Sequence, residues 1–141
     1  MASSGRIAVS YEWRGAFTNA ELELLHTDGF NHVPRRRIDW ATQVTRHSLG
    51  WVCARDTSAL AGFVNVAWDG YKHAFLLDTL VSRSCRHQGI GAEVVALATS
   101  EARAAGCEWL HVDFDTELAP FYFDACGFRP TSAGLVHLGA D

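Results

Sequence analysis

The stretch RHQGIG, from Arg86 to Gly91, combines an arginine with two glycines placed one residue apart. An apolar, strand-like run precedes it, and a run with helical periodicity follows it. The first backbone N–H groups of a helix have no partner within the helix, and the helix dipole attracts negative charge there. Because glycine has no β-carbon, a phosphate can approach such a backbone closely. The stretch therefore indicates an anion site, and a plain tight turn is the alternative interpretation.

Two familiar phosphate loops do not fit this stretch. It lacks the Lys-Ser/Thr pair of a P-loop, and GIGAEV lacks the third glycine of a dinucleotide-binding fingerprint. Acid–base chemistry has a separate candidate in Asp78, which stands inside the apolar run LLDTL. A carboxylate in such a strand needs a partner or a purpose. The alternatives for a general base are Asp113, Asp115, His73 and His111.

The elements that position these residues follow from apolar periodicity and from capping residues. Thr18 or Asn19 is expected to cap the first helix, and the second begins after Asp39 and ends at Gly50. Helices are expected over residues 18–30, 37–50 and 92–105, with a shorter one within 117–128. Strands are expected over residues 6–13, 50–56, 60–70, 74–82, 107–114 and 134–139. This order predicts helices and strands mixed around one largely antiparallel sheet, with a strand–helix–strand unit late in the chain.

The chain has 141 residues, of which 48% are hydrophobic, and a formal net charge of -4. This composition fits one domain, residues 1–141, with a single core. The negative charge argues against a nucleic-acid binder, although three arginines stand together at residues 35–37. No segment has the character of a signal peptide or a membrane span, so we expect a cytoplasmic protein without a membrane partner.

The cysteines and histidines indicate neither a disulfide framework nor a metal site. The four cysteines occur singly, without a CxxC pair, and the histidines lack metal-ligand spacing. We therefore expect free thiols in a reducing compartment and no metal. A thiol enzyme that uses Cys85 with His87 is a further alternative, although no recognisable oxyanion loop accompanies the pair.

The run LVSRSCRHQGIGAEVV, followed later by FYFDACGF, resembles the GNAT superfamily of N-acetyltransferases. That family carries an Arg/Gln-x-x-Gly-x-Gly/Ala loop after its fourth strand, and often a Tyr shortly before a Gly-Phe pair. The matching residues of the second motif are Tyr122, Gly127 and Phe128. The resemblance implies an α/β (α+β) fold with a mixed, mostly antiparallel sheet of about six to seven strands. Its fourth and fifth strands are expected to splay, and about four helices to flank the sheet.

By the same resemblance, acetyl-CoA is the co-substrate. The backbone of Leu80 and Val81 is expected to hold the pantetheine arm and the acetyl carbonyl, as a ligand added to a strand edge. The pyrophosphate is expected to bind the loop formed by Arg86, His87, Gln88, Gly89, Ile90, Gly91 and Ala92.

The resemblance also assigns the acid–base roles. Tyr122 takes the place of the general acid that protonates the departing thiolate, and a core aromatic is the other interpretation of this residue. Asp78 is our first choice for the general base. One position departs from the family pattern, because Asp115 stands where the family often has an asparagine before the tyrosine.

Together these residues predict an N-acetyltransferase in which a primary amine attacks acetyl-CoA directly. A CoA-binding module of the same fold without turnover is the alternative. The acceptor, a small molecule or a peptide amine, is not identified by the sequence, and a homodimer through a sheet edge or exposed aromatic residues is an open option. Asp69 and Gly70 are expected to form a hairpin turn. Aromatic residues could line the acceptor site or belong to the core: Trp13, Phe30, Trp40 and Trp68.

Overall fold

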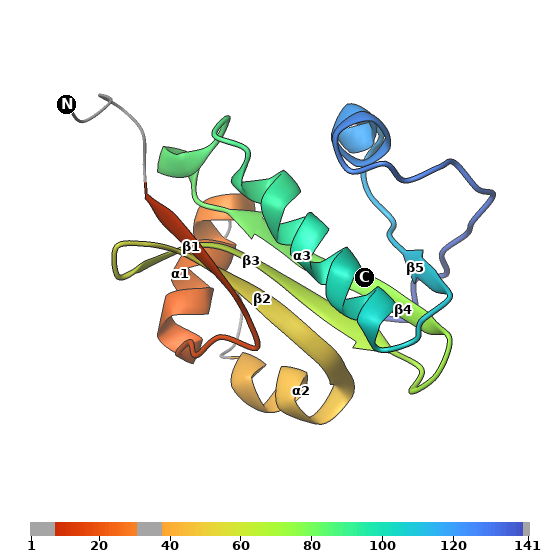
Figure 1. Ribbon diagram of the computed structural model, residues 1–141, viewed down its shortest axis with the longest axis horizontal. Coiled ribbons are helices and arrows are strands. Elements are labelled where there is room, and N and C mark those ends of the chain that lie inside the picture. The colour runs from red at the N-terminus through yellow and green to blue at the C-terminus, as the bar shows by residue number, and fades with distance from the viewer. Residues whose placement is uncertain (1–7, 31–37, 140–141) are drawn as a thin grey trace.

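The computed structural model describes residues 8–30 and 38–139. At its centre is a five-stranded sheet in the order β1-β2-β3-β4-β5, drawn in Figure 1. From β1 to β4 the strands form an antiparallel meander, whereas β5 runs parallel to β4. A parallel neighbour needs a crossover, which a helix supplies between β4 and β5. The strands are β1 (Val9–Trp13), β2 (Ser48–Asp56), β3 (Ala59–Trp68), β4 (His73–Val81) and β5 (Trp109–His111).

Short turns join β2 to β3 and β3 to β4, whereas α1 and α2 lie between β1 and β2. Thr57 adopts a left-handed φ of +58° between β2 and β3. The turn between β3 and β4 is built by Asp69 and Gly70, as expected from the sequence. The Asp69 carboxylate accepts the backbone N–H groups of Tyr71 and His73, and Gly70 has a φ of +84°. Glycine adopts this angle without steric cost, so the turn fixes the start of β4.

Three α-helices pack on the sheet: α1 (Asn19–Phe30), α2 (Trp40–His47) and α3 (Ile90–Ala104). At the start of α1, the Thr18 hydroxyl accepts the Glu21 N–H, and the Glu21 carboxylate accepts the Thr18 N–H. At the start of α2, the Asp39 carboxylate accepts the Thr42 N–H. Thr18 and Asp39 are therefore caps, as the sequence predicts.

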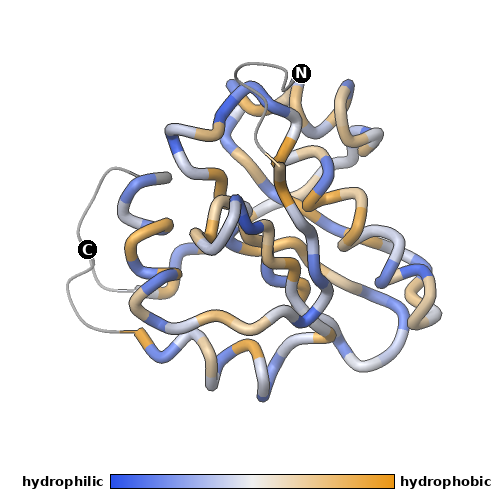
Figure 2. The backbone as a smooth tube through the Cα atoms, turned by 60° about the vertical axis from the view of Figure 1, so that its left-hand side comes forward, coloured by the Kyte–Doolittle hydropathy of each residue, from blue (hydrophilic) through white to orange (hydrophobic). Residues whose placement is uncertain are grey.

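The helices cover opposite faces of the sheet. On one face, α1 and α2 pack over a buried cluster that includes Leu22, Trp40 and Phe63. On the other face, α3 packs over a second cluster that includes Val64 and Val94. Figure 2 shows hydrophobic and hydrophilic residues alternating along the helices, as expected when one side of each helix is buried. The sheet is thus the middle layer of three.

A short π-helix, η3 (Pro120–Ala125), follows β5 through a 3-10 turn, η2 (Thr116–Leu118). Gly127, with a φ of +78°, closes η3 as the sequence predicts. Figure 1 shows η3 and β5 at the end of the molecule opposite β1 and α1. With the three α-helices, η3 brings the count in the described part of the chain to the expected four.

The expectation of six to seven strands is wrong for the described part of the chain, where the sheet has five. The expected strand at residues 134–139 has no regular structure. β5 covers three residues instead of the expected 107–114, because it pairs with β4 only from His73 to Phe75. A strand exists only beside another strand, and the periodicity of one segment does not show whether a neighbour is present.

The second helix ends earlier than expected. α2 stops at His47, and Ser48 is already the first residue of β2. Gly50 is therefore not a helix stop. A β-carbon at Gly50 would overlap the indole of Trp13 on β1, so this glycine permits a close approach between β1 and β2.

Two further expectations concern charge and the membrane. The three arginines at residues 35–37 lie outside the described residues. Across residues 8–30 and 38–139, no helix is long and apolar enough to cross a membrane.

Candidate active site

β4 and β5 splay apart, as expected. They pair in parallel only from His73 to Phe75. Beyond Phe75, no strand of the described chain pairs with this edge of β4. Such an edge presents backbone N–H and C=O groups that can accept an extended ligand. Leu80 and Val81, the residues that the sequence assigns to the pantetheine arm, lie within this unpaired part.

A β-bulge interrupts β4 at Asp78 and Thr79. The register against β3 shifts there, so that two residues of β4 oppose the single residue Val64. Asp78 takes a left-handed φ of +55°. The extra residue reverses the faces of the following side chains: Leu76 lies in the cluster under α3, and Leu80 in the cluster under α1. The bulge therefore decides which side chains of β4 face each side of the sheet.

The loop after β4 enters α3 through left-handed residues. η1 (Arg83–Cys85) is followed by His87 at φ +65° and Gly89 at φ +79°. Gly89 is the N-cap of α3, and a β-carbon there would meet nothing within 4 Å. The Glu93 N–H donates to the Gly89 carbonyl, the first bond of the helix. The earlier N–H groups have no partner within the helix, and open space in front of Gly89 admits an anion.

Part of the expected phosphate loop has a packing role. Ile90 is 2% exposed in the core beneath α3, so only its backbone can face a ligand. A β-carbon at Gly91 would lie 3.1 Å from the ring of Phe121 in η3. Gly91 therefore lets η3 pack closely against α3. The sequence analysis expected a glycine here for another reason, namely to let a phosphate approach the backbone. The rest of the loop is exposed or half-buried: Arg86, His87, Gln88, Gly89 and Ala92.

Tyr122 lies in η3 and is only 5% exposed. Its ring contacts those of Phe114, Phe121 and Phe128. Burial raises the pKa of the Tyr122 phenol, and a hydrogen bond with Thr79 at the bulge partly lowers it. With a pKa above its ordinary value, the phenol keeps its proton at neutral pH and can donate it, as a general acid must.

Thr79 at the bulge hydrogen-bonds Tyr122, and Asp78 is the residue before it; among the described residues no interaction joins the Asp78 and Tyr122 side chains. Burial raises the pKa of the Asp78 carboxyl, and the charge of His26 on α1 partly lowers it. A raised pKa brings a carboxylate closer to the range of an effective general base. The sequence analysis missed both Thr79 and His26. Their interactions connect α1 with β4 and β4 with η3. The sequence pattern of a single segment does not indicate which distant segments it contacts.

A histidine pair lies where β4 and β5 are still joined. His73 Nδ1 and His111 Nε2 are 2.8 Å apart, and the His111 ring stacks on Phe75 with 4.6 Å between centroids. The sequence named each histidine as an alternative base but did not predict their contact. Which ring donates and which accepts the shared hydrogen bond depends on their tautomers. Asp113 and Asp115, which the sequence also offers as a base, are exposed.

The aromatic candidates for the acceptor site are mostly part of the core. Trp40 is 4% exposed, and Trp13 and Trp68 are half-buried against the cluster under α3. The Phe30 side chain is outside the described part of the chain. Cys85 is 4% exposed, so its thiol is not presented to a substrate as a thiol enzyme requires. Within residues 8–30 and 38–139, no three histidine, cysteine or acidic side chains cluster as a metal site.

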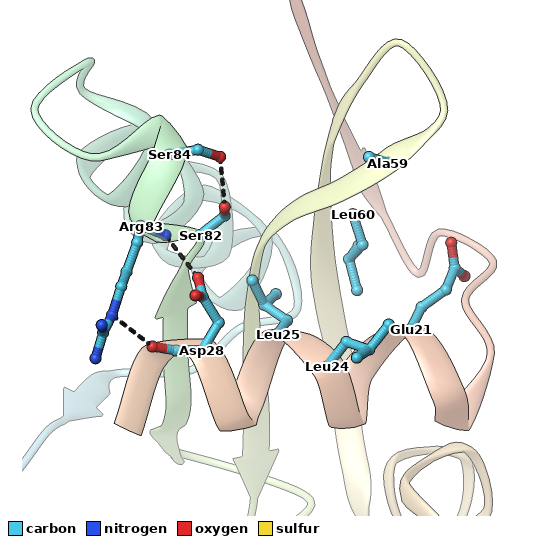
Figure 3. Close-up of a pocket in the computed structure, with 9 residues that line it drawn as sticks. All are labelled: Glu21, Leu24, Leu25, Asp28, Ala59, Leu60, Ser82, Arg83 and Ser84. Carbon is cyan, nitrogen blue, oxygen red and sulfur yellow. Dashed lines mark hydrogen bonds between the residues drawn. The ribbon is translucent and has the colours of Figure 1, made fainter. Parts of the chain in front are cut away.

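A groove of about 560 Å³ lies between α1, the start of β3 and η1, as Figure 3 shows. Leu24 and Leu60 contribute apolar walls. At one end, the Asp28 carboxylate accepts the Arg83 backbone N–H at 2.7 Å. None of the predicted catalytic or loop residues lines this groove, so it is separate from the site at the bulge.

The splayed strands, the bulge and the loop at α3 define the class of the protein, that of the acetyltransferases. A model of the acetyltransferase (GNAT) family matches residues 9–128, which include all five strands, the loop and Tyr122. The chain therefore belongs to the acetyltransferase (GNAT) family. No curated protein sequence gives a significant match.

Solved structures have the same fold at low sequence identity. A protein of unknown function from meticillin-resistant Staphylococcus aureus has a TM-score of 0.78 and 19% identity, covering 94% of this chain and 100% of that chain. A GNAT-family acetyltransferase from Streptococcus pneumoniae has a TM-score of 0.76 and 18% identity, covering 95% and 100%. An aminoglycoside N-acetyltransferase, solved in complex with CoA, has a TM-score of 0.74 and 14% identity, covering 98% and 99%. At such identities the likeness concerns the fold alone.

Proposed function

We propose that the chain is an enzyme that transfers an acetyl group from acetyl-CoA to a primary amine. One arrangement carries the proposal: an unpaired strand edge, a bulge and an open helix N-terminus follow one another from β4 to α3. This arrangement suits a ligand with an extended arm and a pyrophosphate. The related aminoglycoside N-acetyltransferase, solved with CoA, supports the same co-substrate.

The proposed binding residues act mainly through their backbone. The N–H groups of the first turn of α3 hold the pyrophosphate, and the Arg86 guanidinium adds positive charge beside it. The backbone of Leu80 and Val81 holds the pantetheine arm along the free edge of β4. The same loop contributes His87, Gln88, Gly89, Ile90, Gly91 and Ala92.

The proposed reaction is a direct attack. The amine nitrogen forms a bond to the acetyl carbon, the carbon–sulfur bond breaks, and one proton passes overall from nitrogen to sulfur. Asp78 accepts the proton of the amine, directly or through water. Tyr122 donates its phenolic proton to the departing thiolate, and a backbone N–H of β4 polarises the acetyl carbonyl.

The burial of Tyr122 also favours the alternative function, a CoA-binding module without turnover. Its ring is almost fully enclosed by other aromatic rings, as a purely structural residue would be. The proposal specifies the acceptor only by its chemical class, a small-molecule or peptide amine. We also place the protein in the cytoplasm, where its four free cysteines would stay reduced.

Calorimetric titration with acetyl-CoA, CoA and ATP tests the binding half of the proposal. Saturable binding of both CoA species with weaker ATP binding is expected, because only the CoA species carry the arm that β4 accepts. A matched pair of variants locates the site. Gly89→Asp and Gly89→Asn have the same size and both tolerate the left-handed φ, but only Asp adds a negative charge at the loop. We expect Asp to weaken acetyl-CoA binding at least about tenfold more than Asn.

Tyr122→Phe tests the catalytic half. With an acceptor found by screening amines for thiol release, we expect a loss of about 10²- to 10⁴-fold in transfer rate with unchanged acetyl-CoA affinity. An unchanged rate would remove Tyr122 from the mechanism. If acetyl-CoA binds but no amine supports thiol release, the alternative of a binding module is favoured.

A further inference from the structure

Two neighbouring strands carry large apolar side chains that remain exposed. Phe75 and Leu77 on β4 are 38% and 41% exposed, and Trp109 on β5 is 47% exposed. Single exposed apolar residues are common on protein surfaces, but several that lie together indicate a binding surface. The proposed acetyl-CoA site uses the backbone of Leu80 and Val81 and the loop at α3, so it does not account for these three side chains.

The alternation of side chains places this surface on the face of the sheet that α1 and α2 partly cover. Leu76 packs in the cluster under α3, so its neighbours Phe75 and Leu77 point to the other face. Leu110 on β5 also packs against the cluster under α3, and the residues on either side of it share the face of Phe75. Four side chains from two strands thus form one surface, which we call the β4–β5 platform: Phe75, Leu77, Trp109 and His111.

The rings of the platform are held in place by their neighbours. The His111 ring stacks on Phe75, with 4.6 Å between centroids and 18° between the ring planes. His111 Nε2 is in turn 2.8 Å from His73 Nδ1. Because these rings are already oriented, another flat ring can stack on them or meet them edge to face without a further ordering cost. The platform therefore suits an aromatic ligand.

A carboxylate lies beside the platform on the same face. Asp78 follows Leu77 on β4 and interacts with the charge of His26 on α1, so its side chain is directed towards the helices α1 and α2. From Phe75 to Asp78 the strand rises by about 10 Å, enough for an aromatic ring and a short alkyl chain. The carboxylate attracts an ammonium group at one end of such a molecule, and the platform accepts the ring at the other end.

We infer that the acceptor is an aromatic primary amine, with its ring on the β4–β5 platform and its nitrogen beside Asp78. This inference rests on the proposed function and adds the chemical class of the acceptor. In the proposed site the backbone of Leu80 and Val81 holds the acetyl carbonyl on the edge of β4 just past Asp78, so the amine lies next to the acetyl carbon. Its nitrogen bonds to that carbon, the carbon–sulfur bond breaks, Asp78 takes the proton of the amine, and the sulfur receives one from Tyr122.

Calorimetric titration of the CoA-saturated protein with three amines tests the inference, because CoA carries no acetyl group and no reaction can occur. Phenethylamine should bind at least about thirtyfold more tightly than butylamine, which has no ring to bury. Cyclohexylethylamine has as many carbon atoms as phenethylamine, but its puckered ring cannot stack. It should bind about threefold to tenfold more weakly than phenethylamine.

Two variants locate the amine on the platform. Phe75→Leu keeps an apolar side chain without a ring, so it should remove the preference for phenethylamine over cyclohexylethylamine. Leu77→Lys adds a positive charge beside Asp78 and should weaken phenethylamine binding at least about tenfold. Leu24→Lys is the matched control, because it adds the same charge on α1, where the side chain is 74% exposed outside the platform. Its affinity for phenethylamine should equal that of the wild type.

Equal affinities for the three amines would overturn the inference. So would a preference for phenethylamine that survives both Phe75→Leu and Leu77→Lys, since another surface must then hold the ring. If CoA binds normally in either case, the proposed function stands with a different acceptor. Binding of phenethylamine without thiol release from acetyl-CoA supports the amine site and contradicts the transfer. If CoA does not bind, the proposed function fails, and the same titrations of the free protein test the platform alone. Thermal unfolding verifies that each variant is folded.

Discussion

Asp78 combines a half-buried carboxyl group with a left-handed φ of +55° in the middle of a strand. Burial raises the pKa of this carboxyl. The folded protein then binds the proton more tightly than the unfolded chain does. The contribution of Asp78 to stability is consequently most favourable below the ordinary pKa of 3.8, and it is lost as the pH rises through the folded-state pKa. At neutral pH the buried carboxylate is destabilising, and a residue of this kind is retained where it has a function.

Asp78→Asn is therefore expected to change stability and activity in opposite directions. Asparagine has a similar size and tolerates the left-handed angle, but it carries no charge to bury. The free energy of unfolding at pH 7, measured by urea titration, should rise, and its decrease between acidic and neutral pH should become smaller. If Asp78 is the base, kcat/KM should drop about 10²-fold or more.

The exposed Asp113 provides the matched control, because Asp113→Asn removes the same charge without relieving a buried carboxylate. An unchanged or reduced stability of Asp78→Asn would show that the carboxylate is compensated in the folded state. An unchanged kcat/KM would assign the base to another group, with the His73–His111 pair as the next candidate.

At the scale of elements, one ion pair joins the first turn of α1 to β2. Arg55 donates to both Glu21 carboxylate oxygens, at 2.7 and 2.9 Å, and also to the backbone carbonyls of Ala16 and Ser58. Glu21 is at the same time the second member of the capping box with Thr18. The helix start and its attachment to the sheet therefore depend on one carboxylate.

Glu21→Gln should reduce stability at neutral pH by about 1 kcal/mol, a value limited by the solvent screening of an accessible pair. The hydrogen bond from Arg55 lowers the pKa of Glu21 to about 2 from 4.5. The pair therefore stabilises the fold fully above pH 4.5, and this contribution is lost as the pH falls from 4.5 towards 2. Urea titrations at several pH values should show a smaller acid-dependent loss in Glu21→Gln than in the wild type. Glu23→Gln, on the same helix, should keep the wild-type dependence.

Elements with local signals are the ones that the sequence predicts well. Thr18 and Asp39 mark helix starts by their own capping bonds, and Gly127 marks an end by its own φ. The bounds of β5 and the strand at residues 134–139 were predicted wrongly for the opposite reason. Whether these segments form strands depends on a neighbour that lies far away in the chain or in another molecule.

The same distinction applies to the candidate site. The loop from Arg86 to Gly91 could be proposed from the sequence because its residues are consecutive, and the structure gives its glycine at position 89 a left-handed φ. The packing role of Gly91 could not be predicted from the sequence. The ring that packs against it, Phe121, belongs to η3, a separate element. The contact of Thr79 with Tyr122 was missed for the same reason.

At the scale of the whole molecule, the proposed ligand would bind across elements that already share one hydrophobic cluster. The edge of β4 lies between the two core clusters, the loop begins α3, and Tyr122 belongs to η3. Occupation of the site would therefore stabilise the sheet, α3 and η3 together. A ligand that binds only the folded state shifts the unfolding equilibrium of the entire domain.

Acetyl-CoA at about one hundred times its dissociation constant should accordingly stabilise the fold by about 2.7 kcal/mol. For a chain of 141 residues this raises Tm by about 6–10 °C. Tyr122→Phe should show the same increase, because the role proposed for the phenol is to protonate the departing sulfur and not to hold the bound arm. ATP at equal concentration should give a smaller increase, since it offers phosphates to α3 but no arm to β4. Equal increases in Tm with ATP and acetyl-CoA would indicate a general anion site. No increase in Tm with acetyl-CoA would contradict the proposed function.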